Sequence, residues 1–197
     1  MRKIIHAGSL IILACFLFGL LSGCVTSPHD VRDRMTDRIL DSIEDGRYTA
    51  AAQEALVYLA DFPEDIEFLS LLLHSYILNE DLEEAAETAG KLAVVDEDNS
   101  LQWNKLYCRL LADSGQTQSA IHSYERLLED NPDDKEISFS LMTLFIDSDM
   151  YQDALDIATG LYMQNVKDKD VIEKIIEIGE GGNYDWVDSY KAVLNYL

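Results

Sequence analysis

Proline, histidine, cysteine and basic residues are all scarce in this sequence, and each shortage excludes a class of structure or chemistry. Only three prolines occur among 197 residues, which leaves long stretches free to be helical because proline breaks helices. The four histidines form no pair at metal-ligand spacing with carboxylates on one helix face. The sequence also has no glycine-rich phosphate loop and no Gly-x-Ser-x-Gly motif. We therefore expect no metal, no cofactor and no enzymatic activity.

Positive charge is scarce as well. The chain has 15 lysines and arginines against 37 acidic residues, which gives a formal net charge of −22. A surface of this sign repels nucleic acid and anionic lipid headgroups. The composition therefore argues against a nucleic-acid partner and favours a body that stands away from a membrane surface.

The N-terminus has the layout of a secretory signal peptide. A short basic start, Met1–Lys3, precedes a mostly apolar stretch, Ile4–Leu21, and small residues follow it up to Cys24. Such a segment is removed from the mature protein and is excluded from the fold. The alternative is a retained membrane helix, although about 18 apolar residues lie at the lower limit for crossing a bilayer.

Leu21-Ser22-Gly23-Cys24 resembles a bacterial lipoprotein box. The resemblance implies cleavage before Cys24, lipidation of its thiol, and three acyl chains in the mature protein. A single acyl chain binds membranes only marginally, so several chains suit a stable tether. Val25 stands where an aspartate would retain such a protein at the inner membrane, which favours the outer membrane. Without Arg2 and Lys3, 13 basic residues face 37 acidic ones, a net charge of −24.

The remaining cysteines fit this assignment. Cys15 would leave with the signal peptide and Cys24 would carry lipid, so Cys108 has no partner for an intramolecular disulfide. Cys108 lies among apolar residues of a predicted helix, which favours a buried small hydrophobe over the alternative of a reactive thiol.

A repeat of about 34 residues organises the rest of the chain. Its clearest copy is the predicted helix between Gly115 and Pro132, in which apolar residues follow the three-and-four spacing of an amphipathic face. Small anchor residues recur at this period, with a large residue seven positions after each. The anchors are Ala51, Ala85, Ala120 and Ala154, with a weaker copy at Val187; the large residues are Tyr58, Leu92, Leu127, Leu161 and Leu194.

This pattern resembles the tetratricopeptide repeat family, over residues 31 to 197. The resemblance implies an all-α fold, a right-handed α-α superhelix of about five helix pairs. Glu97 and Val166 depart from the family by replacing the closing proline, and its usual Trp-Leu-Gly is lost. The chain would then comprise a signal peptide (1–23), a lipidated cysteine with a linker (24–30) and the repeat domain (31–197).

Turn and cap residues divide the repeat domain into ten predicted helices, and no strand pattern competes with them. The expected pairs are 31–44 with 48–61, 66–78 with 82–95, 101–112 with 117–130, 135–147 with 151–164, and 168–178 with 184–196. The last of these helices is unusually apolar and aromatic. It could pack back on the fourth pair, or offer a docking surface or a homodimer surface.

The family resemblance also implies that the first helix of each pair lines a concave groove. The positions it places there are Asp33, Thr36, Leu40, Glu67, Ser70, His74, Gln102, Lys105, Arg109, Glu136, Phe139 and Thr143. We single out Lys105, Arg109, His74 and Phe139 as candidate partner-binding residues. Lys105 and Arg109 are four residues apart and share one helix face. Some grooves of this family clamp a terminal carboxylate, but the asparagines of that clamp are missing here. The alternative is a surface pair bridged to neighbouring acids.

These features predict a lipoprotein scaffold tethered to a membrane by its N-terminal lipid. It would mediate protein–protein interaction in the cell envelope, facing the periplasm, through its helical-repeat surface. The alternative is a transporter-associated binding protein for a small molecule or peptide. An apolar internal pocket with converging polar groups would favour that alternative.

Overall fold

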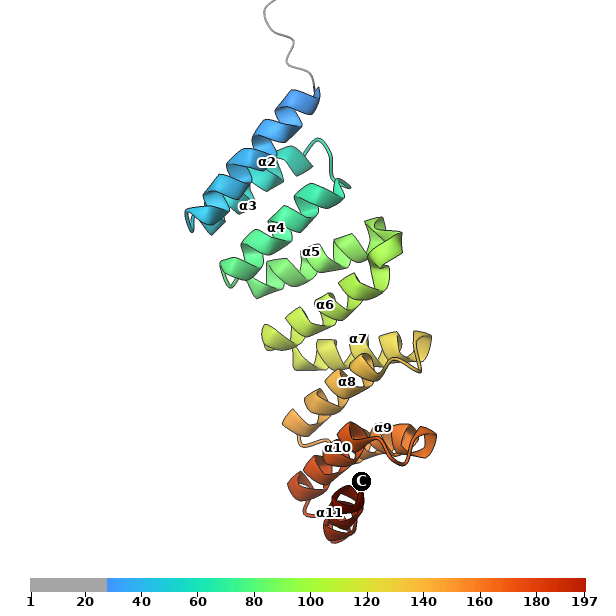
Figure 1. The fold of residues 1–197 in the computed structure, drawn as a ribbon. Coiled ribbons are helices and arrows are strands. Elements are labelled where there is room, and N and C mark those ends of the chain that lie inside the picture. The colour runs from blue at the N-terminus through green and yellow to red at the C-terminus, as the bar shows by residue number, and fades with distance from the viewer. Residues whose placement is uncertain (1–27) are drawn as a thin grey trace, which may run out of the picture.

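The computed structural model describes residues 28–197, and this range folds into an elongated stack of helix pairs without strands (Figure 1). It has the predicted all-α architecture, a right-handed α-α superhelix of five helix pairs. The elements are α2 (Pro28–Glu44), α3 (Tyr48–Leu59), α4 (Ile66–Leu78), α5 (Leu82–Val95), η1 (Glu97–Asn99), α6 (Ser100–Asp113), α7 (Thr117–Asp130), α8 (Lys135–Asp147), α9 (Tyr151–Gln164), α10 (Lys169–Gly181) and α11 (Val187–Tyr196). We call the even-numbered helices A helices and the odd-numbered ones B helices.

The helices begin and end close to their predicted limits, with three differences. The first helix starts at Pro28 instead of Val31, and proline suits a first turn because its missing N–H would have no helical partner there. A short 3₁₀ turn, η1, leads directly into α6. The last helix begins at Val187, three residues later than predicted, and the preceding one extends to Gly181.

One turn geometry joins the two helices of every pair. A residue with positive φ follows each A helix, and the next N–H bonds to the carbonyl five positions back, as in a Schellman motif. The positive-φ residues are Gly46, Glu80, Gly115, Asp149 and Asn183. This backbone repeat has the same period of about 34 residues as the sequence repeat. It supports a count of five pairs independently of the side chains.

The predicted anchor residues all lie in the core. Ala51, Ala85, Ala120 and Ala154 are fully buried, and Val187 is buried at the corresponding place in the last pair. The core forms two clusters that meet on α6. Leu110 and Leu111 belong to the cluster of the first two pairs, whereas Cys108 belongs to the cluster of the later ones.

The C-terminal helix packs mainly on α10 of its own pair, and it reaches the fourth pair, on which the sequence predicted that it could pack, through Tyr190. Trp186 and Val187 approach the backbone of α10 at Gly179, and the ring of Tyr190 packs edge-on against Tyr162 of α9. Beyond these contacts, Tyr196 remains 92% exposed at the end of the array. A dimer surface on this helix would therefore be formed by its last residues.

The predicted signal peptide at 1–23, the predicted lipidation site Cys24 and the linker as far as residue 27 lie outside the described residues. Within 28–197, none of the helices combines the length and the apolar character needed to span a bilayer.

Candidate functional site

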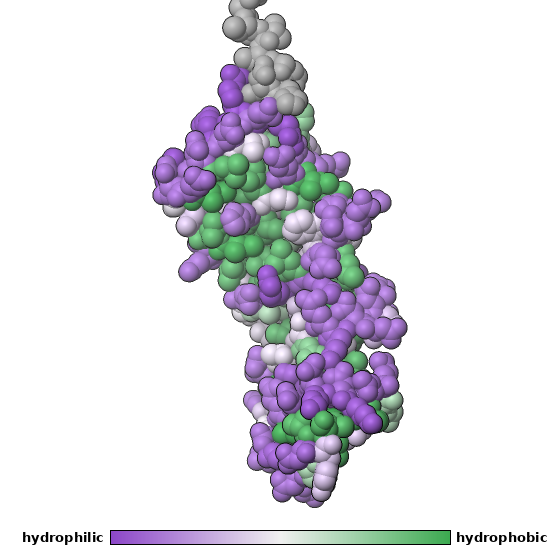
Figure 2. All heavy atoms as spheres, viewed as in Figure 1, coloured by the Kyte–Doolittle hydropathy of each residue, from purple (hydrophilic) through white to green (hydrophobic). Residues whose placement is uncertain are grey.

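Apolar side chains are unevenly distributed over the surface. On the face shown in Figure 2 they gather over the first half of the array, around α2 to α5, and the second half of that face is mostly hydrophilic down to a smaller apolar area near its end. The exposed apolar residues of the first two A helices include Leu40, Ile66 and Leu78. Hollows are recorded instead in the second half, between α6 and α8.

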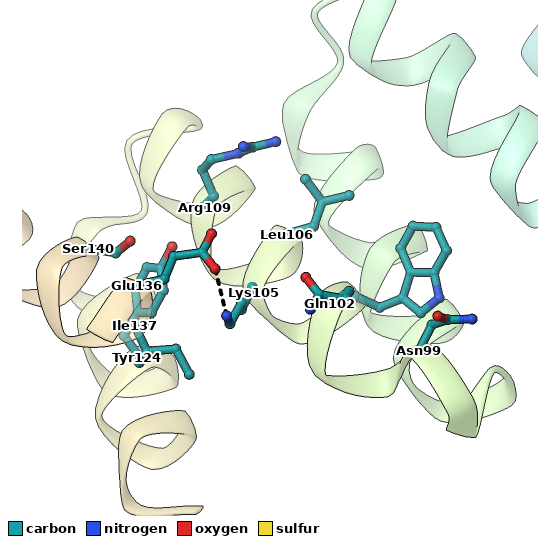
Figure 3. A pocket seen from close by; sticks show the side chains of 10 residues that line it. Asn99, Gln102, Lys105, Leu106, Arg109, Tyr124, Glu136, Ile137 and Ser140 are labelled. Atoms are coloured by element: carbon teal, nitrogen blue, oxygen red, sulfur yellow. Dashed lines mark hydrogen bonds and ion pairs between the residues drawn. The ribbon is translucent and has the colours of Figure 1, made fainter. Parts of the chain in front are cut away.

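We use the name α6–α8 groove for two cavities that adjoin at Arg109, Tyr124 and Ser140. One has a volume of about 480 Å³ and includes Trp103, Lys105 and Glu136 in its lining; the other, of about 450 Å³, includes Phe139 and Asp147. Arg109 lines both cavities and therefore lies in the middle of the α6–α8 groove. Figure 3 shows the first cavity from close by.

Lys105 lies at this groove but is engaged by acids of the next repeat. Its ammonium is 2.7 Å from a carboxylate oxygen of Asp134 and 2.6 Å from one of Glu136 (Figure 3). Burial by itself would lower the pKa of Lys105, but its hydrogen bonds to the two carboxylates outweigh burial and raise the pKa above its usual value. Lys105 therefore matches the alternative raised in the sequence analysis, a cation that is bridged to neighbouring acids.

Arg109 differs from Lys105 in its surroundings. Its side chain is exposed and extends away from the Lys105–Glu136 pair (Figure 3). Among the described residues, the structure records no hydrogen bond or ion pair for its guanidinium. Its planar set of donors remains available to a carboxylate, which arginine can bind through two parallel hydrogen bonds.

The floor of the groove is apolar and well fixed. Leu106 and Ile137 contribute to it, and the indole N–H of Trp103 donates to Asp96 at 2.8 Å. That hydrogen bond, followed by one from Asn99, lowers the pKa of Asp96 and keeps it a charged acceptor. An apolar side chain entering the groove would meet this preformed surface beneath Arg109.

Phe139 and His74 have different positions relative to the groove. Phe139 lines its second cavity on α8, half-buried, with the Lys135 ammonium 5.1 Å from its ring centroid. His74 is exposed on α4 and lines neither cavity. The structure thus brings Lys105, Arg109 and Phe139 together and leaves His74 apart from them.

Sequence reasoning missed a set of ion pairs that join successive repeats. Arg32 on α2 contacts Asp65 at 3.3 Å and Glu67 at 2.6 Å, and Lys135 on α8 lies 2.9 Å from both Asp168 and Asp170. Both cations lie 33 and 35 residues before their acidic partners. A search for a basic residue followed at that offset by Asp-x-Asp or Asp-x-Glu could have found these pairs.

Cys108 is buried beside α7 and is 2% exposed. Burial raises the pKa of its thiol to about 11, so the thiol is protonated at neutral pH. A protonated buried thiol is a poor nucleophile, and Cys108 matches the interpretation of a small core residue. No cluster of metal-ligating side chains occurs among residues of the described range.

Comparisons with known proteins identify the fold. The MamA protein superposes with a TM-score of 0.62 at 17% identity, covering 83% of this chain and 90% of that one. A tetratricopeptide repeat protein from Parabacteroides merdae gives 0.62 at 18%, over 83% and 65%. YrrB, described as a TPR protein with an unusual peptide-binding site, gives 0.55 at 15%, over 79% and 80%. These similarities establish a tetratricopeptide-like fold.

Sequence comparison adds little to this result. No family model matches the chain. The 131 kDa subunit of transcription factor tau from Saccharomyces cerevisiae is 27% identical over 103 residues. That match covers 51% of this chain and 10% of the yeast protein, so the chain spans only a small part of its curated relative.

Proposed function

We propose that the chain is a non-enzymatic scaffold that binds a partner protein through the α6–α8 groove. The observation that carries the proposal is Arg109, a cation for which residues 28–197 provide no ion pair, at an apolar groove of a strongly acidic protein. The fold supports it, since solenoid repeats present extended concave surfaces for binding.

The chemistry of the groove favours a segment that combines a carboxylate with an apolar side chain. Arg109 would bind the carboxylate, and the surface formed by Trp103, Leu106 and Ile137 would receive the apolar group. The acids around Lys105 would repel a segment that carries several carboxylates, which limits the choice to a single well-placed one.

The test compares Arg109 with an arginine that lies outside the groove. A partner captured by crosslinking from membranes and identified by mass spectrometry would be titrated by calorimetry against Arg109→Ala. We expect a loss of affinity of at least about tenfold, typical of a central interface residue, with unchanged unfolding. Arg126→Ala, at an exposed arginine of α7 outside the groove, is the matched control. Equal affinities for the two variants would contradict the assignment of the groove.

We further propose that the scaffold is a lipoprotein tethered through Cys24 in the cell envelope, facing the periplasm, with the outer membrane favoured over the inner one. The support is the sequence Leu21-Ser22-Gly23-Cys24 after an apolar stretch. Cys24→Ala should abolish labelling by a radioactive fatty acid. Absence of label on the unaltered protein would refute the lipid tether.

A transporter-associated binding protein for a small molecule or peptide is the second candidate. The cavity of about 480 Å³ has a size that is typical of ligand pockets. A metabolite or short peptide that raises the melting temperature of the protein but not of Arg109→Ala would favour this function over the scaffold.

A further inference from the structure

A second groove lies on the opposite set of helices, between α7 and α9. Two cavities of about 510 Å³ and 250 Å³ share Leu128, Asp156 and Ile157, so they form one continuous depression. We call it the α7–α9 groove. It is separate from the α6–α8 groove, since the two have no lining residue in common.

The α7–α9 groove has an apolar floor and acidic walls. The floor comprises Leu128, Leu141, Phe145, Ile157 and Leu161. Glu125 and Glu129 rise from α7 on one side, and Asp153 and Asp156 from α9 on the other. Its lining contains no lysine or arginine.

The four carboxylates are poorly compensated within the protein. Asp156 accepts a hydrogen bond from the amide of Gln152 at 2.8 Å, and Glu125 lies 3.9 Å from an imidazole nitrogen of His122. Within the described part of the chain, the structure records no ion pair for Glu129 or Asp153. These exposed acids give the groove a negative potential that attracts an added cation.

The acidic walls are specific to this pair of B helices. One repeat earlier, Gly90 and Val94 of α5 occupy the positions that correspond to Glu125 and Glu129. On the opposite side, Ser119 and His122 of α7 correspond to Asp153 and Asp156. The repeat architecture therefore provides a gap between B helices, but it does not itself place four carboxylates around that gap.

We propose that the α7–α9 groove binds a basic amphipathic segment of a partner protein. Leucine-like side chains at helical spacing would cover the floor, and lysines or arginines on both flanks would pair with the walls. Charge complementarity decides the occupant. Anionic lipid would be repelled, and a second copy of a chain with net charge −22 offers the wrong sign.

The probe is a synthetic helix of about 15 residues with leucines at i, i+3, i+4 and i+7 and lysines on both flanks. Its binding to the protein would be followed by fluorescence anisotropy. The variant Glu125→Lys with Glu129→Lys should bind it at least about tenfold more weakly. Glu83→Lys with Glu87→Lys is the matched control, because these exposed acids have the same spacing on another B helix, α5. The control should lose less than about threefold.

Equal losses in the two variants would show that the probe responds only to total charge, and they would overturn the proposal. A photoactivatable leucine analogue in the probe gives a readout that is independent of mutation. Crosslinks should fall on α7, on α9 or on the floor residues Leu141 and Phe145 of α8, whereas crosslinks on the other A helices would contradict the assignment. Arg109→Ala should leave binding of this probe unchanged, so failure here is distinguishable from failure of the α6–α8 groove.

Discussion

Gly160 and Gly179 both lie inside helices, but a methyl group would meet different surroundings at each. A Cβ on Gly160 has nothing within 4 Å, whereas one on Gly179 would lie 2.5 Å from Val187 and 2.8 Å from Trp186. Gly160→Ala should therefore stabilise the protein by about 0.5–1 kcal/mol through helix propensity. Gly179→Ala should destabilise it by about 1–3 kcal/mol, because α11 must move. Urea unfolding of the pair measures both, and equal shifts would contradict the packing of α11.

Glu80 is in the left-handed conformation, with φ of 63°, at a turn where two other repeats have glycine. Residues with a Cβ adopt this backbone conformation at a cost of about 1–2 kcal/mol. The side chain of Glu80 is exposed. Glu80→Gly should therefore raise stability by about 0.5–1 kcal/mol, since glycine gives back part of that gain as entropy. Asn183→Gly is the comparison, and its gain should be smaller because asparagine tolerates this region. A lower urea midpoint for Glu80→Gly would refute the reasoning.

The anchor alanines give the sharpest test of the predicted crossings. Ala120 and Ala154 are both fully buried. Ala120→Leu or Ala154→Leu should overpack the crossing and cost about 1–3 kcal/mol, seen as lower urea midpoints. Unchanged midpoints for both variants would mean that these alanines do not lie at the crossings.

At the scale of the element, the aspartates that begin α8 and α10 serve two partners at once. Asp134 and Asp168 accept a backbone N–H of their own helix and contact a lysine of the preceding repeat. Burial would raise the pKa of Asp134, but the hydrogen bond from Lys105 and the helix N–H groups lower it overall. For Asp168, the hydrogen bond from Lys135 is the main cause of a lowered pKa.

These lowered pKa values predict how stability depends on pH. These two aspartates take up protons in the unfolded chain at the ordinary carboxyl pKa, before they do so in the folded chain, so the stability that they contribute is lost as pH drops below about 5. Asp168→Asn keeps a capping side chain without the charge, and we expect a flatter decline between about pH 5 and 2. Its cost at neutral pH should be at most about 1 kcal/mol, because Lys135 is well exposed. Thermal unfolding across pH measures this, and parallel curves would contradict it.

The end of the array gives a second prediction at this scale. Tyr196 is largely exposed, and Leu197 is partly so, although α11 packs on α10. If these residues form a dimer contact, light scattering should show concentration-dependent mass for the full chain and not for Tyr196→Ser. A monomer at every concentration would restrict α11 to its role as a terminal helix.

Sequence patterns predicted the elements well and the contacts between them only in part. Gly46 and Gly115 mark turns by their residue type, so the helix limits around them were predictable. The late start of α11 was not, because it depends on how Trp186 packs against Gly179. Nor could sequence distinguish Lys105 from Arg109, since the acids that engage Lys105 lie 29 and 31 residues away and are placed by the superhelix.

For the whole molecule, salt has two opposite effects on stability: it weakens the repulsion among like charges, which stabilises the fold, and it weakens ion pairs, which destabilises it. Salt screens both, and the Debye length falls from about 30 Å at 0.01 M to about 8 Å at 0.15 M. Exposed pairs contribute about 0–1 kcal/mol each, whereas 37 acidic residues repel one another over the whole surface. We expect the melting temperature to rise with salt at neutral pH. The rise should shrink near the isoelectric point of about 4.2. A fall at neutral pH would mean that the ion pairs dominate.

The packing of each described helix mainly against its neighbours in sequence, from α2 on α3 to α10 on α11, bears on how quickly the chain folds. Contacts between nearby residues close short loops and lose little chain entropy before they form. Helical proteins with such low contact order fold on the order of microseconds to milliseconds. Since any pair can form first and its neighbours can add to it, folding has no obligatory starting point along the array. A new polypeptide could therefore acquire structure pair by pair, before its last helix has been synthesised.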